Sequence, residues 1–303
     1  MTVTERFEQA RPRLRRLAYS ELGDLGEAED IVQEAWLRLE RTDAESLENL
    51  DGWLTTVVAR LALDRLRSAR VRRETYVGPW LPEPLVSDDP ADRVTLDETV
   101  SYALLTVLEQ LSPAERTAFV LHDVFDLPFG DVAEVVGRTP EAVRQLASRA
   151  RRHIRRERPR FAPSREEHDR VVRAFAQVLA EGNLEGLVAV LDPDVVWTSD
   201  GGGRAVAARK PLFGGERVAR AWAALSRRSV HEPIEIQLNG WLGLMVPGTD
   251  GHRAALSFVV VDGRITRIDA IRNPEKLRRA AWSAPGPTST AEFAVTAGAA
   301  GAS

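Results

Sequence analysis

Arginine and short polar side chains alternate with apolar ones through residues 138–156, a pattern that suits hydrogen bonding to nucleic acid. In a helix, the apolar residues of this stretch would share one face: Val143, Leu146, Ala150 and Ile154. The opposite face would carry the polar residues Arg138, Arg144, Gln145, Ser148, Arg149 and Arg152. Guanidinium, amide and hydroxyl groups bind phosphates and the base edges of the major groove. The alternative is a surface helix whose arginine face is only solvated.

The residues before this stretch fit a helix-turn-helix, which needs a small residue in its first helix, a glycine at the turn and apolar residues on its second helix. Ala133, Gly137 and Val143 meet these requirements. Thr139 is placed to cap the second helix, and Pro140 suits its first position, where the missing N–H costs nothing. The pattern therefore favours DNA binding by this part of the chain.

Charge is segregated along the chain, although the total of 45 acidic and 41 basic residues gives a net charge of only −4. Residues 60–73 hold six arginines against one acid, and residues 138–160 hold nine arginines against two acids. Residues 21–51 hold eleven acids against two arginines, and residues 81–100 hold six acids against one arginine. Two separate basic blocks at the ends of helices suit phosphate-contacting modules better than a single solvated face.

Composition limits the class of protein. A chain of 303 residues with 44% hydrophobic and 28% charged residues predicts a soluble protein of two or three domains. The absence of cysteine excludes disulfides, thiolate zinc sites and cysteine nucleophiles. No apolar run approaches the ~20 residues of a membrane helix, and the first residues lack a signal-peptide core. We therefore expect a cytoplasmic protein without membrane contact.

Apolar periodicity predicts helices through the first 73 residues, with Asp51 capping the third of them. Glycine, proline and acids then cluster from Gly78 to Pro90, which is typical of a linker. Helical pattern returns from about Leu96 to Arg156.

The pattern changes again after residue 163. Ser164 and Glu167 fit a capping box that opens a helix through Leu179. After a second short helix, residues 234–238 alternate as in a half-buried strand. Asp262 and Gly263 lie between two apolar runs, which predicts a hairpin. Helices followed by strands predict an α+β domain.

The helix-turn-helix segment LSPAERTAFVLHDVFDLPFGDVAEVVGRTPEAVRQLASRARRHIR (residues 111–155) resembles region 4 of bacterial sigma factors, which reads the −35 promoter element. Residues 23–39 and 51–74 resemble region 2, whose second part melts and reads the −10 element. Only regions 2 and 4 are present, joined by a short linker, as in extracytoplasmic-function sigma factors. The resemblance implies that the chain binds core RNA polymerase and promoter DNA.

The resemblance implies roles for region 2 residues. Asp30, Gln33 and Glu34 would contact the clamp of the polymerase largest subunit, because an acidic helix face pairs with cations on a partner. Trp53 would stack on an unpaired promoter base or, equally, pack in the core. Arg60 stands where many relatives have asparagine, so no −10 sequence preference carries over. We expect the basic residues that follow to contact DNA phosphates: Arg65, Arg67 and Arg70.

Residues 164–282 resemble the SnoaL-like, NTF2-like cone fold, a curved sheet wrapped around helices with a pocket inside. Three motifs, YVGPWLPEP, SDGGGR and RNPEKL, make the chain similar to SigJ-type sigma factors, which carry this domain as a fusion. Glu275 replaces the aspartate usual in the last motif. In that group the domain regulates the sigma factor in cis, so no separate anti-sigma factor is expected. The implied regulatory contacts involve Trp80, Pro82, Asp200, Gly201, Gly202, Arg204, Asn273, Pro274 and Lys276.

The expected fold class is multidomain, with two all-α sigma domains followed by an α+β SnoaL/NTF2-like cone domain. The expected parts are sigma region 2 (1–75), an acidic proline-rich linker (76–100), sigma region 4 (101–160), the SnoaL-like domain (164–282) and a disordered tail (283–303).

An enzymatic role for the last domain would need acid/base groups inside its pocket. The candidates are Asp200, His231, His252 and Asp269, with Trp197 and Trp241 as pocket walls. An isolated histidine beside a strand is more often structural than catalytic, and fold analogy alone establishes no chemistry. We therefore expect no catalysis, no metal and no cofactor, while an unidentified small-molecule ligand of the pocket stays open. Two other classes stay open as well: a conventional helix-turn-helix regulator, and a DNA-binding module fused to a SnoaL-like enzyme.

Overall fold

We analysed a computed structural model of the chain. It describes residues 2–43, 47–73, 75–87, 100–157, 163–226, 232–248 and 250–279, apart from the side chains of residues 69–73 and 226. His231, the tail at 283–303 and most of the acidic part of the linker lie outside the described residues.

Three helices form the N-terminal unit: α1 (Val3–Leu22), α2 (Leu25–Glu40) and α3 (Leu50–Arg73). Helix α1 begins with a capping box between Thr2 and Glu5. The prediction that Asp51 caps α3 is wrong by two residues. Helix α3 starts at Leu50, and the Gly52 N–H donates to Oδ1 of Asn49.

The second helical unit consists of α4 (Tyr102–Leu108), α5 (Pro113–Phe119), the π-helix η3 (Val120–Val124), α6 (Phe129–Val136) and α7 (Pro140–Glu157). Gly137 has a φ of 71° and ends α6 in the left-handed conformation, which turns the chain into α7. The predicted helix-turn-helix is confirmed in this α6–α7 pair.

The C-terminal unit is an α+β domain, as predicted. Its helices are α8 (Arg165–Ala180), α9 (Leu184–Val190) and α10 (Gly215–Ser226). The strands are β1 (Val86–Ser87), β2 (Leu191–Asp200), β3 (Leu212–Phe213), β4 (Ile234–Leu238), β5 (Trp241–Pro247), β6 (Arg253–Val261) and β7 (Arg264–Ile271). They form one sheet in the order β1-β4-β5-β6-β7-β2-β3, in which β2 and β7 are parallel.

Two features of this domain differ from the sequence prediction. Helix α10 was not expected, although Val218, Ala219, Trp222 and Ala223 all lie buried on one of its faces. The linker also contributes a strand, since β1 pairs antiparallel with β4 at the sheet edge. Strands this short carry too little periodicity to be read from a sequence.

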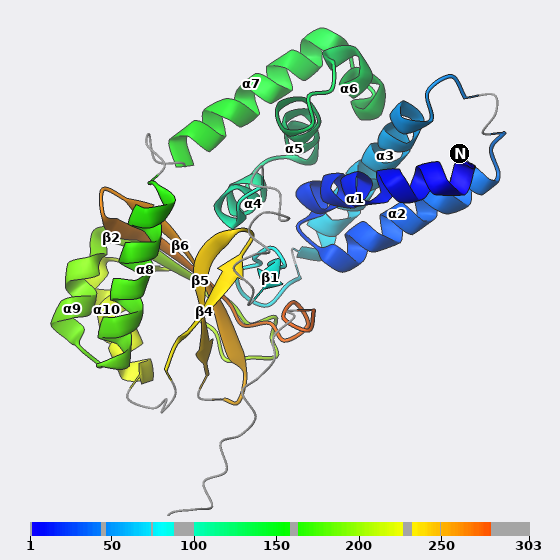
Figure 1. Cartoon of the computed structure of the whole chain (residues 1–303). Coiled ribbons are helices and arrows are strands. Elements are labelled where there is room, and N and C mark those ends of the chain that lie inside the picture. The colour runs from blue at the N-terminus through cyan, green and yellow to red at the C-terminus, as the bar shows by residue number, and fades with distance from the viewer. Residues whose placement is uncertain are drawn as a thin grey trace, which may run out of the picture.

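The sheet buries both of its faces. The helices α8, α9 and α10 lie together against one face (Figure 1), and their apolar side chains form a core with β2 and β5–β7. On the other face, Leu81 of the linker and Tyr102 of α4 pack against Ile236, Met245 and Ile271. The linker and the start of the second helical unit are therefore part of the C-terminal core.

The two helical units share one hydrophobic core. Leu105, Ala118, Leu121 and Val132 of the second unit belong to the same buried cluster as the apolar residues of α1, α2 and α3. This packing between units was not predicted, because each unit's apolar face looks complete in its own sequence.

Candidate functional site

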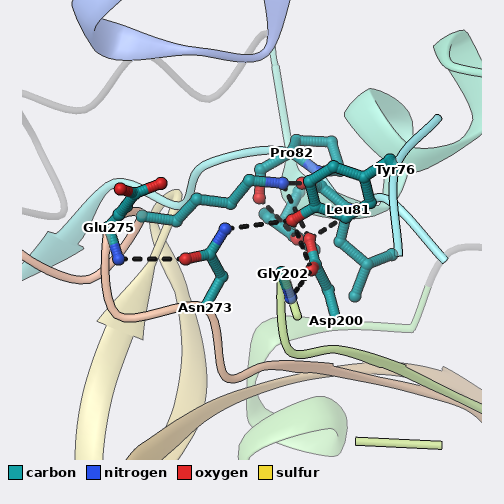
Figure 2. A network of polar contacts seen from close by, with 9 residues as sticks. Tyr76, Leu81, Pro82, Asp200, Gly202, Asn273 and Glu275 are labelled. Atoms are coloured by element: carbon teal, nitrogen blue, oxygen red, sulfur yellow. Dashed lines mark hydrogen bonds and ion pairs between the residues drawn. The ribbon is translucent and has the colours of Figure 1, made fainter. Parts of the chain in front are cut away.

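The linker meets the C-terminal domain at the carboxylate of Asp200, which ends β2 and has no solvent exposure. Its Oδ1 accepts hydrogen bonds from the Tyr76 hydroxyl at 2.7 Å and from the Gly202 N–H at 3.0 Å. Its Oδ2 accepts from the Leu81 N–H at 2.9 Å and pairs with Nζ of Lys276 at 2.7 Å. Figure 2 shows these groups converging on one point from the linker, β2 and the segment after β7.

Lys276 completes the charge balance of this site and is itself 8% exposed. Its ammonium group also donates to the Leu81 carbonyl. It lies 4.0 Å from the ring centroid of Trp80 and 5.3 Å from that of Tyr76, where the π-faces attract a cation. The two aromatic side chains of the linker therefore surround a buried ion pair supplied by the C-terminal domain.

Two hydrogen bonds hold the hydroxyl of Tyr76. The hydroxyl donates to Asp200 and accepts from Nδ2 of Asn273 at 2.9 Å. The side-chain oxygen of Asn273 accepts from the Glu275 N–H at 3.0 Å, which orients the amide. Burial, reinforced by the hydrogen bond and charge of Asp200, raises the pKa of Tyr76.

The glycines after Asp200 are needed for close packing. Gly202 has a φ of +60°, and a Cβ there would collide with the side-chain amide of Asn273. A Cβ on Gly201 would collide with the carbonyl of Ala205. A run of glycines that reads from sequence as a flexible turn is thus a tightly packed loop.

The other predicted regulatory residues lie around this centre. Pro82 is buried, and its carbonyl accepts from the Tyr102 hydroxyl of α4 at 2.9 Å. Arg204 pairs with Glu275 at 2.7 Å, with both side chains at least half exposed. Pro274 is half-buried.

The linker also binds the N-terminal unit through Glu83. Its N–H donates to the Gly23 carbonyl at 2.7 Å, and its carbonyl accepts from the Tyr19 hydroxyl at 2.7 Å. Its carboxylate accepts from the Leu25 N–H at 2.8 Å. Because the Pro82 carbonyl binds Tyr102 of α4 and the Leu81 N–H binds Asp200, three consecutive linker residues contact all three units of the molecule.

Asn239 also holds the linker, and sequence reasoning missed it. Its N–H and its side-chain oxygen bond the Leu85 backbone at 2.9 and 3.0 Å, and its Nδ2 donates to the Tyr19 hydroxyl at 3.0 Å. Asn239 has a φ of +47°, and Gly240 follows it. The Asn-Gly pair is the available sequence signal, but it predicts a hairpin turn and not a contact 220 residues away.

The predicted DNA-reading residues lie together on the solvent side of α7 and its preceding turn, and all six are exposed. Arg144 stands over the Phe129 ring at 5.4 Å and pairs with Glu141 at 2.8 Å. Arg149 pairs with Glu115 at 2.8 Å. These ion pairs are exposed and weak, so they leave the arginines available to a phosphate or base.

The polymerase-binding candidates of region 2 are exposed, whereas its candidate for base stacking is packed on the core. Asp30, Gln33 and Glu34 are exposed together on α2. Trp53 is half-buried and packs against the N-terminal core.

The basic candidates of α3 have partners within the chain. Nη2 of Arg60 donates to the Glu134 carbonyl of α6 at 3.1 Å. Arg65 pairs with Glu27 at 3.8 Å, and Arg67 pairs with Asp64 at 3.2 Å. The side chain of Arg70 lies outside the described residues.

Polar groups are buried where the two helical units meet. Arg116 of α5 is 2% exposed, binds the Glu109 carboxylate and donates to the Ser20 carbonyl at 3.3 Å. Thr117 donates to Oε2 of Glu21 at 3.0 Å, while Oε1 of Glu21 has no partner among the described residues. Burial raises the pKa of Glu21 to about 7, because desolvation outweighs the attraction of Arg116 and the Thr117 hydrogen bond.

The enzymatic candidates that the structure describes, Asp200, His252 and Asp269, do not meet at a pocket. A cavity of about 340 Å³ lies between the helices and the sheet, lined by Trp197 as predicted and by Trp222. Trp241 does not line this cavity; its ring meets His168 edge-on at 5.0 Å, and the Arg165 guanidinium lies 4.9 Å from its centroid. Asp200, His252 and Asp269 do not line the cavity either.

The two acids are engaged elsewhere, since Asp200 binds the linker and Asp269 pairs with Arg267 at 2.8 Å. The described residues hold no histidine and carboxylate cluster suited to a metal ion. Within those residues, no helix is both long and apolar enough to span a bilayer.

Two sigma-70 family models match this architecture: sigma-70 region 2 matches residues 6–72, and sigma-70 region 4 matches residues 101–154. The chain belongs to the extracytoplasmic-function (ECF) RNA polymerase sigma factors. It is 41% identical over 292 residues to the ECF RNA polymerase sigma factor SigJ of Mycobacterium tuberculosis, covering 91% of this chain and 93% of that protein.

Two further comparisons agree. The probable ECF RNA polymerase sigma factor SigI of the same species is 37% identical, covering 86% of this chain and 90% of that one. The crystal structure of M. tuberculosis SigJ superposes with a TM-score of 0.75 at 38% identity, covering 91% of this chain and 98% of that structure. The protein directs RNA polymerase to promoters and is not an enzyme, which removes the two other classes that the sequence left open.

The contact between the helical units should weaken as the pH rises. The pKa of Glu21 is about 7 in the packed state, against 4.5 for the ordinary side chain, so between these pH values the packed state binds more protons than the separated state. The contact therefore loses stability as the pH rises through this interval, and its stability stays constant at higher pH. Fluorophores on Glu40→Cys and Arg156→Cys, in a chain without native cysteine, would report this as reduced energy transfer at pH 8 compared with pH 5.5.

The matched variant for this measurement is Glu21→Gln, which mimics the protonated side chain. It should show high energy transfer at both pH values. A pH response of equal size in Glu21→Gln would mean that another group is responsible.

Proposed function

We propose that the C-terminal domain regulates this sigma factor in cis, by holding the linker and with it regions 2 and 4 in a closed arrangement. The observation that carries the proposal is the buried carboxylate of Asp200, which binds both Tyr76 and Leu81 of the linker. A docking segment tethered in the same chain has an effective concentration of order millimolar, so this contact needs no high intrinsic affinity. No separate anti-sigma factor is required for such control.

The closed arrangement is incompatible with simultaneous reading of both promoter elements. The −10 and −35 elements lie ~25 base pairs apart, roughly 85 Å at about 3.4 Å per base pair. Regions 2 and 4 here share one core, and Arg60 of region 2 donates a hydrogen bond to the backbone carbonyl of Glu134 in region 4 at 3.1 Å. Engagement of a promoter therefore requires the two regions to separate while the linker leaves its position on the sheet.

In the open state, region 2 would contact polymerase and the −10 element. The exposed face of Asp30, Gln33 and Glu34 would bind the clamp of the polymerase largest subunit, where opposite charge sets orientation and association rate. Promoter contacts of region 2 would come from Trp53, Arg60, Arg65, Arg67 and Arg70. We propose that the protein acts in the cytoplasm, together with polymerase and DNA.

Region 4 would read the −35 element with α7. The first residues of a recognition helix contact base edges, and later residues contact the backbone. We therefore assign base contacts to Arg138, Arg144 and Gln145, and phosphate contacts to Ser148, Arg149 and Arg152.

Asp200→Asn should open the molecule. The variant keeps the shape but removes the negative charge that faces Lys276, and breaking a buried ion pair by removing one partner typically costs ~3–5 kcal/mol. Energy transfer between the labels at positions 40 and 156 should fall, and transcription with core polymerase on a mapped promoter should rise at least tenfold over the basal level.

Glu275→Gln is the matched control, because it removes a carboxylate from the same motif whose pair with Arg204 is exposed. It should behave as the unmodified chain. If Asp200→Asn leaves both energy transfer and transcription unchanged, the cis-regulatory proposal is wrong.

The assignment within α7 makes a separate prediction about DNA binding. Arg144→Ala should weaken binding to the −35 sequence by ~1–3 kcal/mol relative to unrelated DNA. Arg152→Ala should weaken binding to both sequences equally and should lower the salt slope by about one. Binding is measured with core polymerase present at several salt concentrations, and Arg220→Ala, on an exposed face of α10, serves as the control.

A further inference from the structure

The face of α2 that carries Asp30 and Gln33 extends to the first turn of the helix. Gly26 precedes Asp30 by one turn and Gln33 by two turns, so the three positions lie along one side of α2. Glu29 borders this side and is exposed, as Asp30 and Gln33 are. A partner that binds along this face would therefore also meet Gly26 and Glu29.

The C-terminal domain reaches this end of the face through Arg279. Nη1 of Arg279 pairs with Oε2 of Glu29 at 3.2 Å. The guanidinium also lies close to the helix backbone, because a Cβ added to Gly26 would be 3.5 Å from Nη2 of Arg279. In Figure 1 the orange segment that follows β7 leads from the sheet toward the helical units. Arg279 thus covers the first turn of α2.

This pair differs from the other ion pairs of α2 in where its cation comes from. Acids of α2 also pair with arginines of α1, α2 and α3, namely Arg15, Arg38 and Arg65. Those arginines belong to region 2 and stay with it in any arrangement of the units. Arg279 belongs to the C-terminal domain, so its pair with Glu29 exists only while that domain is docked on region 2.

The position of Arg279 is set by the Asp200 site. Lys276, three residues earlier, is buried and binds both Asp200 and the Leu81 carbonyl. Leu277 packs against the apolar cluster between the sheet and the linker. The segment that completes the linker site is therefore also the segment that brings Arg279 to α2.

The contact is weak by itself but is favoured by its tether. Arg279 and Glu29 are 47% and 48% exposed, and an exposed ion pair contributes little to stability. Within one chain, however, the effective concentration of a tethered group is of order millimolar. A cation of a separate protein that approaches Glu29 must therefore displace one that is already present.

We propose that Arg279 competes with RNA polymerase for α2, by holding Glu29 and covering Gly26 where a cation of the polymerase clamp would bind. The inference rests on the polymerase-binding face proposed above. It adds a second effect to cis regulation: the closed arrangement disfavours binding of polymerase itself, in addition to simultaneous reading of both promoter elements.

Competition is tested by measuring the affinity of the full, unlabelled chain for core polymerase. Arg279→Ala should raise the affinity about two- to fivefold, the size expected of an exposed ion pair. Arg278→Ala is the matched control, because it removes the same charge from the neighbouring exposed residue and so has the same effect on net charge. It should leave the affinity unchanged. An equal gain in both variants would overturn the competition.

A second measurement separates competition from opening of the molecule. Without polymerase, Arg279→Ala should keep the energy transfer between labels at positions 40 and 156, because the Asp200 site still holds the linker. If energy transfer falls as far as in Asp200→Asn, Arg279 acts by stabilising the closed arrangement, and direct competition is wrong.

The Asp200→Asn background completes the test, because its C-terminal segment no longer holds Arg279 on α2. There, Arg279→Ala should add no further affinity, whereas Glu29→Gln should weaken polymerase binding about two- to fivefold. Unchanged affinity in Arg279→Ala, with energy transfer lost in Asp200→Asn, would refute the competition and leave cis regulation standing. Unchanged energy transfer in Asp200→Asn would instead refute cis regulation.

Discussion

A carboxylate without access to water must be compensated where it stands, and Asp200 is compensated by groups from two parts of the chain. Lys276 supplies the counter-charge from its own domain, whereas Tyr76 and Leu81 supply hydrogen bonds from the linker. If the linker left, the pair would keep its charge balance but lose hydrogen bonds and its aromatic cover. The position of the linker, and therefore of the helices on either side of it, depends on keeping this ion pair dry.

The sequence was informative where structure is local. Ala133, Gly137 and Val143 specify the helix-turn-helix through spacing alone, and Asp262-Gly263 specifies its hairpin. The tertiary partners were not readable. Tyr19 looks like a core aromatic residue, yet its hydroxyl joins Glu83 to Asn239. Likewise, the apolar faces of regions 2 and 4 show that each is buried, but not that they bury each other. Domain boundaries and the roles of the site residues remain predictions.

The cavity of the C-terminal domain shows the same limit of sequence reasoning, because one of its two predicted wall residues was wrong. Trp197 and Trp241 both lie on strands and both looked able to line a pocket, but only Trp197 does. The second tryptophan of the wall is Trp222 on α10, whose ring lies 5.1 Å from that of Trp197, and the strand-rich pattern around this helix concealed it. Which tryptophans face each other depends on how the helix crosses the sheet, and side-chain spacing within one element does not encode that crossing.

Control through the linker suits a protein whose reading surfaces must stay complementary to DNA and polymerase. A sensor that altered α7 or the acidic face of α2 would change specificity together with activity. Under the proposed regulation, holding the segment between them would change only the population of the open state, and each 1.4 kcal/mol would change that ratio tenfold. Glu21 and Asp200 both lie outside the proposed reading residues, one at the contact between the helical units and one at the linker. We therefore expect moderate changes at either position to alter how often the molecule opens without altering what it recognises.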